Sequence, residues 1–458
     1  MLCLSCFHAL PRASFVVMLL ATGGSAFAQI LPPAPGGGPP PAAGSLPALT
    51  PAPLSPALTP PRAPAQSAPQ GPAAQNAAPV VKAKPKSKPK PAPLREMALT
   101  TDHRPSLQPE TFYATAKASE RYAEIADAGG WPTVSAVAPG ASGQAVATLR
   151  RRLSIEGDLA ASQGDGEQWD EALTAAVKRF QSRMGLRQTG IVSGATLKAM
   201  NVPAAVRFRQ LASSAQRIAG STFGFGQKYV VVNIPSASVE AIEDGRVVRR
   251  YTAVVGDVKH ASPEVATRVV AINLNPTWTV PTSIIKNEII PKMRKDPGYL
   301  SRAKIRVLDG SGAEVDPASV NWATEHAASF TLRQDSGAHN ALGSIRINMP
   351  NSQAVYMHDT PSKRFFAADY RFLSHGCVRV EGVYDLAAWL LDSSGRVTKE
   401  SLLEKQKGGE RTDLRLSQPV PVAWIYMTGW ASADGAVNFR DDVYGYDRIG
   451  GVARTAAN

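Results

Sequence analysis

The sequence predicts a multidomain α+β protein in which a disordered Pro-rich linker precedes a small helical module, and a mainly β domain with a helical insert follows. Three observations indicate this organisation. The chain has 458 residues, which is more than one hydrophobic core normally holds. Twenty of its 37 prolines lie between residues 29 and 95. Beyond Gly226 the apolar pattern changes from helical spacing to β-rich runs.

The first 28 residues have the pattern of an export signal. Arg12 precedes an apolar run over 15–21, and Ala26-Phe27-Ala28 is a small-x-small cleavage pattern. The apolar run is too short to cross a bilayer, so we expect no transmembrane segment after cleavage. Cleavage after Ala28 removes Cys3 and Cys6 and leaves Cys377 as the single cysteine of an exported chain.

Residues 29–95 are rich in Pro and Ala and contain seven Lys and Arg residues but no acidic residue. Such a segment has too few large apolar side chains to form a core, which predicts a disordered, semi-extended linker. Both a tether across the cell envelope and a solvated spacer fit this composition. Because this segment carries much of the net charge of +13, the basic composition does not indicate a nucleic-acid partner.

Residues 96–226 are expected to form a helical scaffold. In residues 171–184 the apolar side chains fall on one helical stripe, with Asp170 as the expected N-cap and Gly185 just past the end. Two shorter helices are expected, over 143–159 and 193–200. These three helices predict a small module at about residues 140–202.

Residues 227–447 are expected to form the mainly β domain, and residues 448–458 a C-terminal tail. An Asp244-Gly245 turn predicts a hairpin. A long stretch at about 283–338 interrupts the strands and begins with a helical pattern, which is typical of a lid or binding loop. The expected strands cover residues 229–234, 239–243, 247–255, 268–274, 344–348, 354–358 and 422–427.

Cys377 lies within the most informative part of the sequence. A thiol of ordinary pKa is mostly protonated at neutral pH, so a nucleophilic cysteine needs a base or a positive field. His375 is two residues away, and His358 ends an expected strand that the intervening loop can bring beside Cys377. This arrangement favours a Cys–His pair across neighbouring strands. An inert core cysteine is the alternative.

The residues around Cys377 suit acyl transfer. Gly376 permits a backbone conformation in which amides near Cys377 face an oxyanion. Arg379 supplies a fixed positive charge for a carboxylate-bearing substrate. Apolar residues at helical spacing follow, so we expect the nucleophile on a turn just ahead of a helix, whose N-terminus would lower the thiol pKa.

Two other enzyme classes are disfavoured. His358, His375 and Cys377 are zinc ligands by type, but the sequence contains no His-Glu-x-x-His motif and shows no metal spacing among its other histidines. No Ser-x-x-Lys stretch is accompanied by the partner motifs of serine-type transpeptidases. We therefore expect neither a metal nor a cofactor.

The motif formed by His358, a fifteen-residue gap and Ser374-His375-Gly376-Cys377, followed by Val378-Arg379, resembles the signature of L,D-transpeptidases of the YkuD type. Further segments are similar to the large periplasmic YcbB-like branch of that family, among them residues 275–281, 294–300, 340–343, 355–361 and 439–447. The module at about 140–202 resembles the peptidoglycan-binding domain of many wall enzymes.

The resemblance implies a role for each matching residue. Cys377 is the acylated nucleophile and His358 its general base, while Ser374, His375 and Gly376 shape the site. Arg379 binds substrate, and the insert at about 283–338 caps the active site. Tyr356 and Trp278 are candidates for the pocket wall, for which core packing is the alternative. Asp359 is a candidate for substrate binding and a weak candidate for a third catalytic member.

The implied activity is transfer of a peptidoglycan tetrapeptide stem through a thioester, in the periplasm and in association with the wall. The acceptor is an amine of a second stem, giving a 3→3 cross-link, or an amine of an envelope protein. Water as acceptor would make the protein a carboxypeptidase. A carbapenem-like lactam is expected to acylate Cys377. The competing class is a non-catalytic scaffold that binds peptidoglycan.

Overall fold

The computed structural model describes residues 95–392 and 396–447, all of which fall within one compact unit. The expected signal segment, nearly all of the linker and the C-terminal tail lie outside these residues. In the described residues, no helix is long and apolar enough to cross a membrane.

Among the described residues, five α-helices precede the first strand. Asp170 accepts a hydrogen bond from the Leu173 amide at 2.8 Å, which confirms it as an N-cap. Long helices at both ends of the module, Thr111–Asp127 and Ala204–Ile218, pack against each other and enlarge the three-helix module expected from the sequence. The five helices are α1 Thr111–Asp127, α2 Gln144–Glu156, α3 Glu171–Arg183, α4 Gly194–Met200 and α5 Ala204–Ile218.

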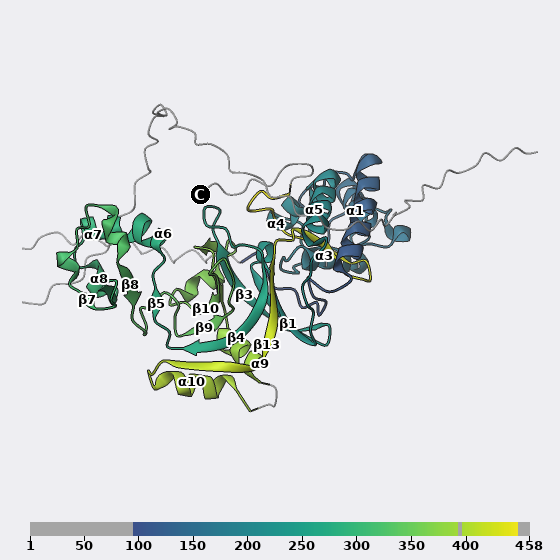
Figure 1. Cartoon of the computed structure of the whole chain (residues 1–458). Coiled ribbons are helices and arrows are strands. Elements are labelled where there is room, and N and C mark those ends of the chain that lie inside the picture. Colours follow the sequence, from purple (N-terminus) through teal and green to yellow (C-terminus); the bar gives the residue numbers. More distant parts are fainter. Residues whose placement is uncertain (1–94, 393–395, 448–458) are drawn as a thin grey trace, which may run out of the picture. The chain divides into compact units, whose positions relative to one another are not determined.

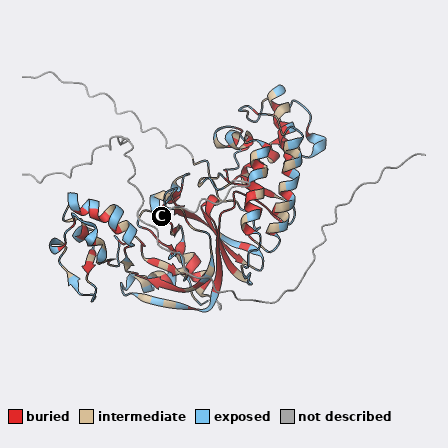
Figure 2. Cartoon of the chain, turned by 45° about the horizontal axis from the view of Figure 1, so that its top comes forward, coloured by how far each residue is buried: buried red, intermediate tan, exposed pale blue. Residues whose placement is uncertain are grey.

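The centre of the β domain is a nine-stranded sheet of mixed direction, in the order β11-β3-β12-β10-β9-β4-β13-β1-β2. Strand β2, at one end of this order, also pairs with β3, the second strand from the other end. Buried residues follow these strands (Figure 2). The strands are β1 Lys228–Asn233, β2 Ser238–Glu243, β3 Arg246–Gly256, β4 Val265–Leu274, β9 Ile345–Asn348, β10 Met357–His358, β11 Phe372–Ser374, β12 Val378–Val380 and β13 Thr412–Ile425.

Helix α9, Val383–Leu391, packs against the same core through its apolar face, and α10, Lys399–Lys407, follows it. The sequence led us to expect Cys377 on a turn directly before this helix. Instead, strand β12 stands between Cys377 and Val383, because the residues after the nucleophile continue the sheet. The α9 N-terminus is therefore not adjacent to the thiol along the chain.

The insert between β4 and β9 is a small domain, here called the cap, and it is not purely helical. Its helical part runs from Thr282 to Lys295 and contains a π-helical turn at Ile285–Ile289. The cap also has a four-stranded sheet in the order β5-β8-β6-β7, which the sequence analysis missed (Figure 1). Its elements are β5 Trp278–Thr279, α6 Thr282–Ile284, α7 Ile290–Lys295, α8 Tyr299–Arg302, β6 Ile305–Leu308, β7 Glu314–Val315 and β8 Thr331–Gln334.

On each side of the expected boundary at residue 226, one module contributes a segment to the core of the other. The hairpin β14 Gly429–Ala431 and β15 Val437–Phe439 contributes Phe439 to the core of the helices. In return Leu107, which precedes α1, packs with Tyr229 in a cluster beside the sheet. Each module therefore completes its core with a segment that is distant in sequence.

Candidate active site

Cys377 lies on the short turn between β11 and β12. The Ser374 hydroxyl donates a hydrogen bond to the Cys377 carbonyl at 2.5 Å, and the Ser262 hydroxyl donates to the Gly376 carbonyl at 2.7 Å. Gly376 has a φ of +105°, a conformation that favours glycine. Two buried hydroxyl groups and one glycine thus fix the backbone on which the thiol is carried.

His358 comes from the neighbouring strand. Strands β10 and β12 are parallel, with Met357 opposite Val378 and His358 opposite Arg379. Met357 and Val378 are fully buried in the sheet's core, so alternation places His358 and Arg379 on the other face. Cys377, His358 and Arg379 all line one cleft of about 450 Å³.

The cap forms the opposite wall of this cleft. Glu288, on the π-helical turn, forms an ion pair with His375, with Oε1 and Nε2 2.7 Å apart. The ring of His260 lies against His375, with 4.5 Å between the ring centroids. Apolar cap residues Ile284 and Ile289 also line the cleft. The residues around Cys377 therefore lie between the sheet and the cap.

His358 is held as a neutral imidazole. It is 5 % exposed, and burial lowers its pKa to about 4, with the positive charge of Arg379 acting in the same direction. Backbone groups of Asp359 and Leu342 oppose this change. Its Nδ1 is buried without a hydrogen-bond partner among the described residues. A neutral imidazole at pH 7 can accept a proton.

Burial raises the pKa of the Cys377 thiol, and hydrogen bonding with Tyr356 and the charge of Arg379 only partly offset this. This direction is opposite to the lowered thiol pKa expected from the sequence. The physical reason is that the cap and sheet exclude water while α9 begins six residues later. Cys377 is nevertheless half-buried and reachable from the cleft.

No hydrogen bond joins the Cys377 thiol to the His358 ring in the described structure, although both line the same cleft. With the thiol pKa raised and the imidazole pKa lowered, both groups are neutral at rest. The geometry therefore suits proton transfer during nucleophilic attack and does not favour a preformed thiolate–imidazolium pair.

Tyr356 and Trp278 both line the cleft, as the resemblance implied. Tyr356 is half-buried, and its pKa is raised by burial and by the proximity of Cys377. The guanidinium of Arg346 lies 5.4 Å from the centroid of the Tyr356 ring. Tyr356 and Trp278 also line an adjoining groove of about 510 Å³ that includes Arg346 and two other arginines.

Asp359 is not brought into the cleft. Its buried carboxylate accepts hydrogen bonds from the Ser344 amide at 3.1 Å and the Ser344 hydroxyl at 3.0 Å, and it pairs with Lys363. These partners hold the carboxylate beside the loop at Gly343, away from the lining of the cleft. The weak expectation of a substrate-facing or catalytic Asp359 is therefore not supported by its position.

Sequence reasoning missed several residues of this site. Ser262 is 3 % exposed and links the Gly256 amide, at 2.9 Å, to the turn before Cys377. Tyr444 donates to the Gly256 carbonyl at 2.6 Å. Glu288 contacts His375 across the cleft. Of these three residues, only Tyr444 lies in a segment that resembles the family, residues 439–447. No spacing in the sequence relates Ser262 or Glu288 to Cys377.

Two family models match this chain. Residues 227–408 match the model described as "L,D-transpeptidase catalytic domain" (YkuD). Residues 142–200 match the one described as "Putative peptidoglycan binding domain". The chain therefore has a YkuD-type L,D-transpeptidase catalytic domain preceded by a peptidoglycan-binding domain. The expected fold class, a helical module followed by a mainly β domain of this type, is confirmed.

Similar proteins carry the same family name. A Haemophilus influenzae protein named "Putative L,D-transpeptidase" is 35 % identical over 222 residues, which are 48 % of this chain and 44 % of that protein. The chain thus matches less than half the length of this relative.

Solved L,D-transpeptidases are also similar. A structure from Xylanimonas cellulosilytica has 18 % identity and a TM-score of 0.22, and covers 64 % of this chain and 98 % of that one. One from Stackebrandtia nassauensis has 15 % identity and a TM-score of 0.23, covering 64 % and 97 % respectively. Scores this low carry no argument about the site.

Proposed function

We propose that this chain is a cysteine-dependent L,D-transpeptidase that acts on peptidoglycan tetrapeptide stems through a thioester on Cys377. The observation that carries the proposal is the convergence of Cys377, His358 and Arg379 on one face of the sheet, in a cleft that the cap lines on its other side. The two matched domains, one for transpeptidation and one for peptidoglycan binding, support peptidoglycan as the substrate.

In the first step, the Cys377 sulfur attacks the carbonyl that joins the third and fourth residues of the donor stem. His358, neutral at pH 7, accepts the thiol proton as the C–S bond forms. The Cys377 backbone N–H donates to no other described residue and is free to stabilise the oxyanion. Collapse expels the terminal D-amino acid, whose amine takes the proton from His358.

In the second step, an amine attacks the thioester, His358 accepts a proton from that amine, and the Cys377 thiol is restored on collapse. An amine on a second stem gives a 3→3 cross-link, and an amine on an envelope protein attaches that protein to the wall. Cap residues Ile284 and Ile289 line the cleft and limit access of water, which favours an amine acceptor over hydrolysis.

Arg379 is proposed to bind a carboxylate of the donor stem. Arg379 lines the cleft, and it lies directly opposite His358 in the pairing of β10 with β12. Its Nε is buried without a hydrogen-bond partner among the described residues. The adjoining groove with its arginines extends the positive surface beyond the nucleophile. An acidic stem peptide therefore matches the charge of the site.

The location we propose is the periplasm, in contact with the wall. The export-like residues 1–28 and the two wall-related domains support this placement.

Incubation of the purified protein with disaccharide tetrapeptide tests the proposal. A cross-linked dimer together with released D-amino acid is expected, along with a covalent adduct on the Cys377 peptide in mass spectra. The variant Cys377→Ala serves as the matched control and should give neither product nor adduct. Tripeptide alone would identify a carboxypeptidase, and unchanged substrate with retained sacculus binding would identify a scaffold.

A further inference from the structure

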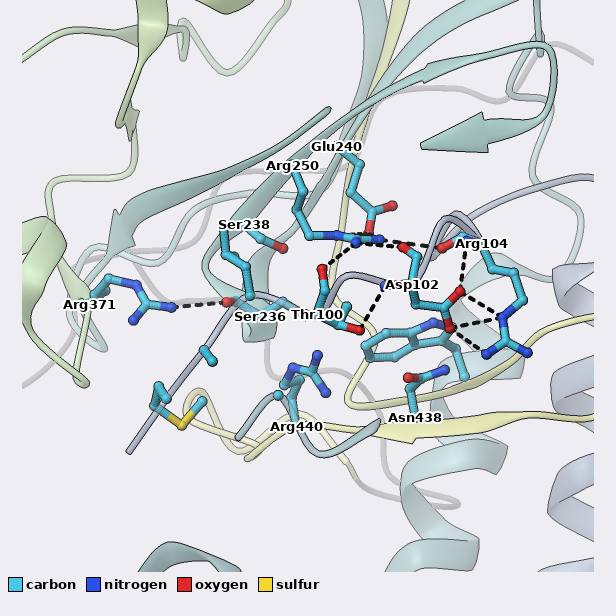
Figure 3. Close-up of a pocket in the computed structure, with 15 residues that line it drawn as sticks. Thr100, Asp102, Arg104, Ser236, Ser238, Glu240, Arg250, Arg371, Asn438 and Arg440 are labelled. Atoms are coloured by element: carbon cyan, nitrogen blue, oxygen red, sulfur yellow. Dashed lines mark hydrogen bonds and ion pairs between the residues drawn. The ribbon is translucent and has the colours of Figure 1, made fainter. Parts of the chain in front are cut away.

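A small cavity away from the active-site cleft lies where three parts of the fold meet. It is lined by the segment at residues 97–104, by strands β2 and β3, and by the segment that contains Asn438 and Arg440. Figure 3 shows Ser238, Glu240 and Arg250 approaching from one side, and Arg440 and Asn438 from the other. Its volume is about 20 Å³, enough for a single small species.

The charges that line this cavity do not cancel. Asp102 pairs with Arg104 at 2.8 Å, and Glu240 pairs with Arg250 at 2.9 Å. Arg371 and Arg440 also line the cavity, are 3 % and 8 % exposed, and form no ion pair with any described residue. Nearby carboxylates favour the charged form of each arginine without bonding to it, namely Glu240 and Asp441 for Arg440 and Asp369 and Glu381 for Arg371, and burial outweighs them. A bound counter-charge would lower the cost of this burial.

Neither guanidinium group has a carboxylate partner among the described residues: both donate hydrogen bonds to backbone carbonyls, and the Arg440 guanidinium also lies over the Trp430 ring, 5.1 Å from its centroid. Arg440 donates through Nη1 to the carbonyls of Arg183 and Phe439, at 2.8 and 2.6 Å. Arg371 donates to the carbonyls of Ala368 at 3.0 Å and Ser236 at 3.4 Å, while its Nε is buried without a partner. Neutral carbonyls satisfy hydrogen bonds but leave the full positive charge in place.

Several polar groups at the cavity have no protein partner. The Nε and Nη2 atoms of Arg440 and the side chains of Ser238 and Asn438 form no hydrogen bond with other described residues. Gly185 leaves room for the Arg440 guanidinium, because a Cβ there would lie 2.7 to 2.9 Å from it. The cavity therefore presents hydrogen-bond donors and an excess of positive charge to the same small volume.

Electrostatics supports this description. Burial, together with the charges of Arg250 and Arg371, lowers the pKa of Arg440 to about 9. Burial, with a contribution from Arg95, lowers the pKa of Arg371 to about 10. Both arginines remain charged at pH 7, so each carries a positive charge at the cavity without a directly bonded carboxylate.

We propose that this cavity binds one monatomic anion of the size of chloride, with Arg440 as its principal donor. Ser238 and Asn438 supply neutral donors, and Arg371 contributes charge. A tetrahedral oxyanion is too large for the volume. The bound anion links the loop after α3, the N-terminal segment at 97–104 and strands β2 and β3, and so joins the peptidoglycan-binding domain to the catalytic domain.

Thermal unfolding of the full chain tests the proposal. At constant ionic strength, replacing gluconate with chloride should raise the midpoint temperature along a saturating curve, whereas sulfate should not. The variant Arg440→Gln should weaken the apparent chloride affinity at least tenfold. Arg415→Gln, at an exposed arginine without an ion pair, is the matched control and should retain the chloride response. Equal responses to chloride and gluconate would overturn the proposal.

Bromide soaking of crystals of the unmodified chain keeps the proposal testable if Arg440→Gln does not fold. An anomalous peak beside the Arg440 guanidinium is the expected result. Density there without anomalous signal would show that water fills the cavity, and it would exclude the anion. Neither experiment measures transpeptidation, so their outcome is independent of the proposed activity.

Discussion

Glu288 in the cap and His375 beside Cys377 are joined by an ion pair with a 2.7 Å separation, although they lie 87 positions apart in the sequence. The contact connects the π-helical turn of the cap to the turn that carries Cys377. Both side chains are partly exposed, at 33 % and 41 %. The pair is thus a direct link by which cap position and the geometry of the active-site turn influence each other.

Glu288→Gln is expected to loosen this link. A partly exposed ion pair contributes about 0.5 to 1 kcal/mol, so we expect kcat/KM for the tetrapeptide to fall about two- to fivefold. The matched control is Glu325→Gln, which removes another cap carboxylate that pairs with Lys286 but does not line the cleft. Equal losses in the two variants would show that the Glu288–His375 contact has no special role.

The pH dependence of thiol alkylation should reflect the raised pKa of Cys377. Because burial disfavours the thiolate, the iodoacetamide rate should still be rising at pH 9, the ordinary value for the thiol. Mass spectrometry of the Cys377 peptide after timed alkylation measures this. A rate that is already constant at pH 7 would contradict the raised pKa.

Stability should fall with decreasing pH because His358 is buried in its neutral form. Its pKa is lowered from 6.5 to about 4, so between these values the unfolded chain binds more protons than the folded one. The stabilisation is present above pH 6.5 and is lost as the pH falls to 4, by about 3 kcal/mol. Urea unfolding at pH 7, 5.5 and 4 measures this loss, and His358→Gln should remove that part of the dependence.

Cys377→Ala should abolish product formation and leave the fold intact. The thiol is half-buried beside an open cleft, so its removal creates little enclosed cavity, and the free energy of unfolding should change by less than about 1 kcal/mol. Activity assays and urea unfolding on the same preparation test both parts. Loss of stability in step with activity would indicate a structural cysteine.

Ser262→Ala should disturb the turn that positions the nucleophile. The change leaves the Gly256 amide and the Gly376 carbonyl without their buried partner, at a cost of about 1 to 3 kcal/mol. Because Gly376 precedes Cys377, we also expect a carbapenem to acylate Cys377 with a lower maximal rate. The lactam concentration that gives half of this maximal rate should be unchanged. Ser119→Ala, which removes a hydroxyl bonded within α1, is the control and should acylate at the normal rate.

Several features of the fold and site were accessible from local sequence. The Asp244-Gly245 turn, the N-cap Asp170 and the apolar face of α9 each depend on neighbouring residues, and each is present in the structure. The pairing of the strand that ends at His358 with the strand that begins just after Cys377 also followed from a short motif. Local propensity and short loops determine these features, so a single sequence contains the necessary information.

A single sequence was enough to predict the order of the modules, the candidate reactive residues Cys377 and His358, and the strand pairing beside them. The three-dimensional packing was needed to learn that Glu288 contacts His375, that Phe439 completes the core of the helices, that the cap contains a sheet and that the thiol pKa is raised. The physical reason is that burial and charge depend on every segment that packs against a group. Those segments come from distant parts of the chain, and no local sequence pattern predicts that they pack there.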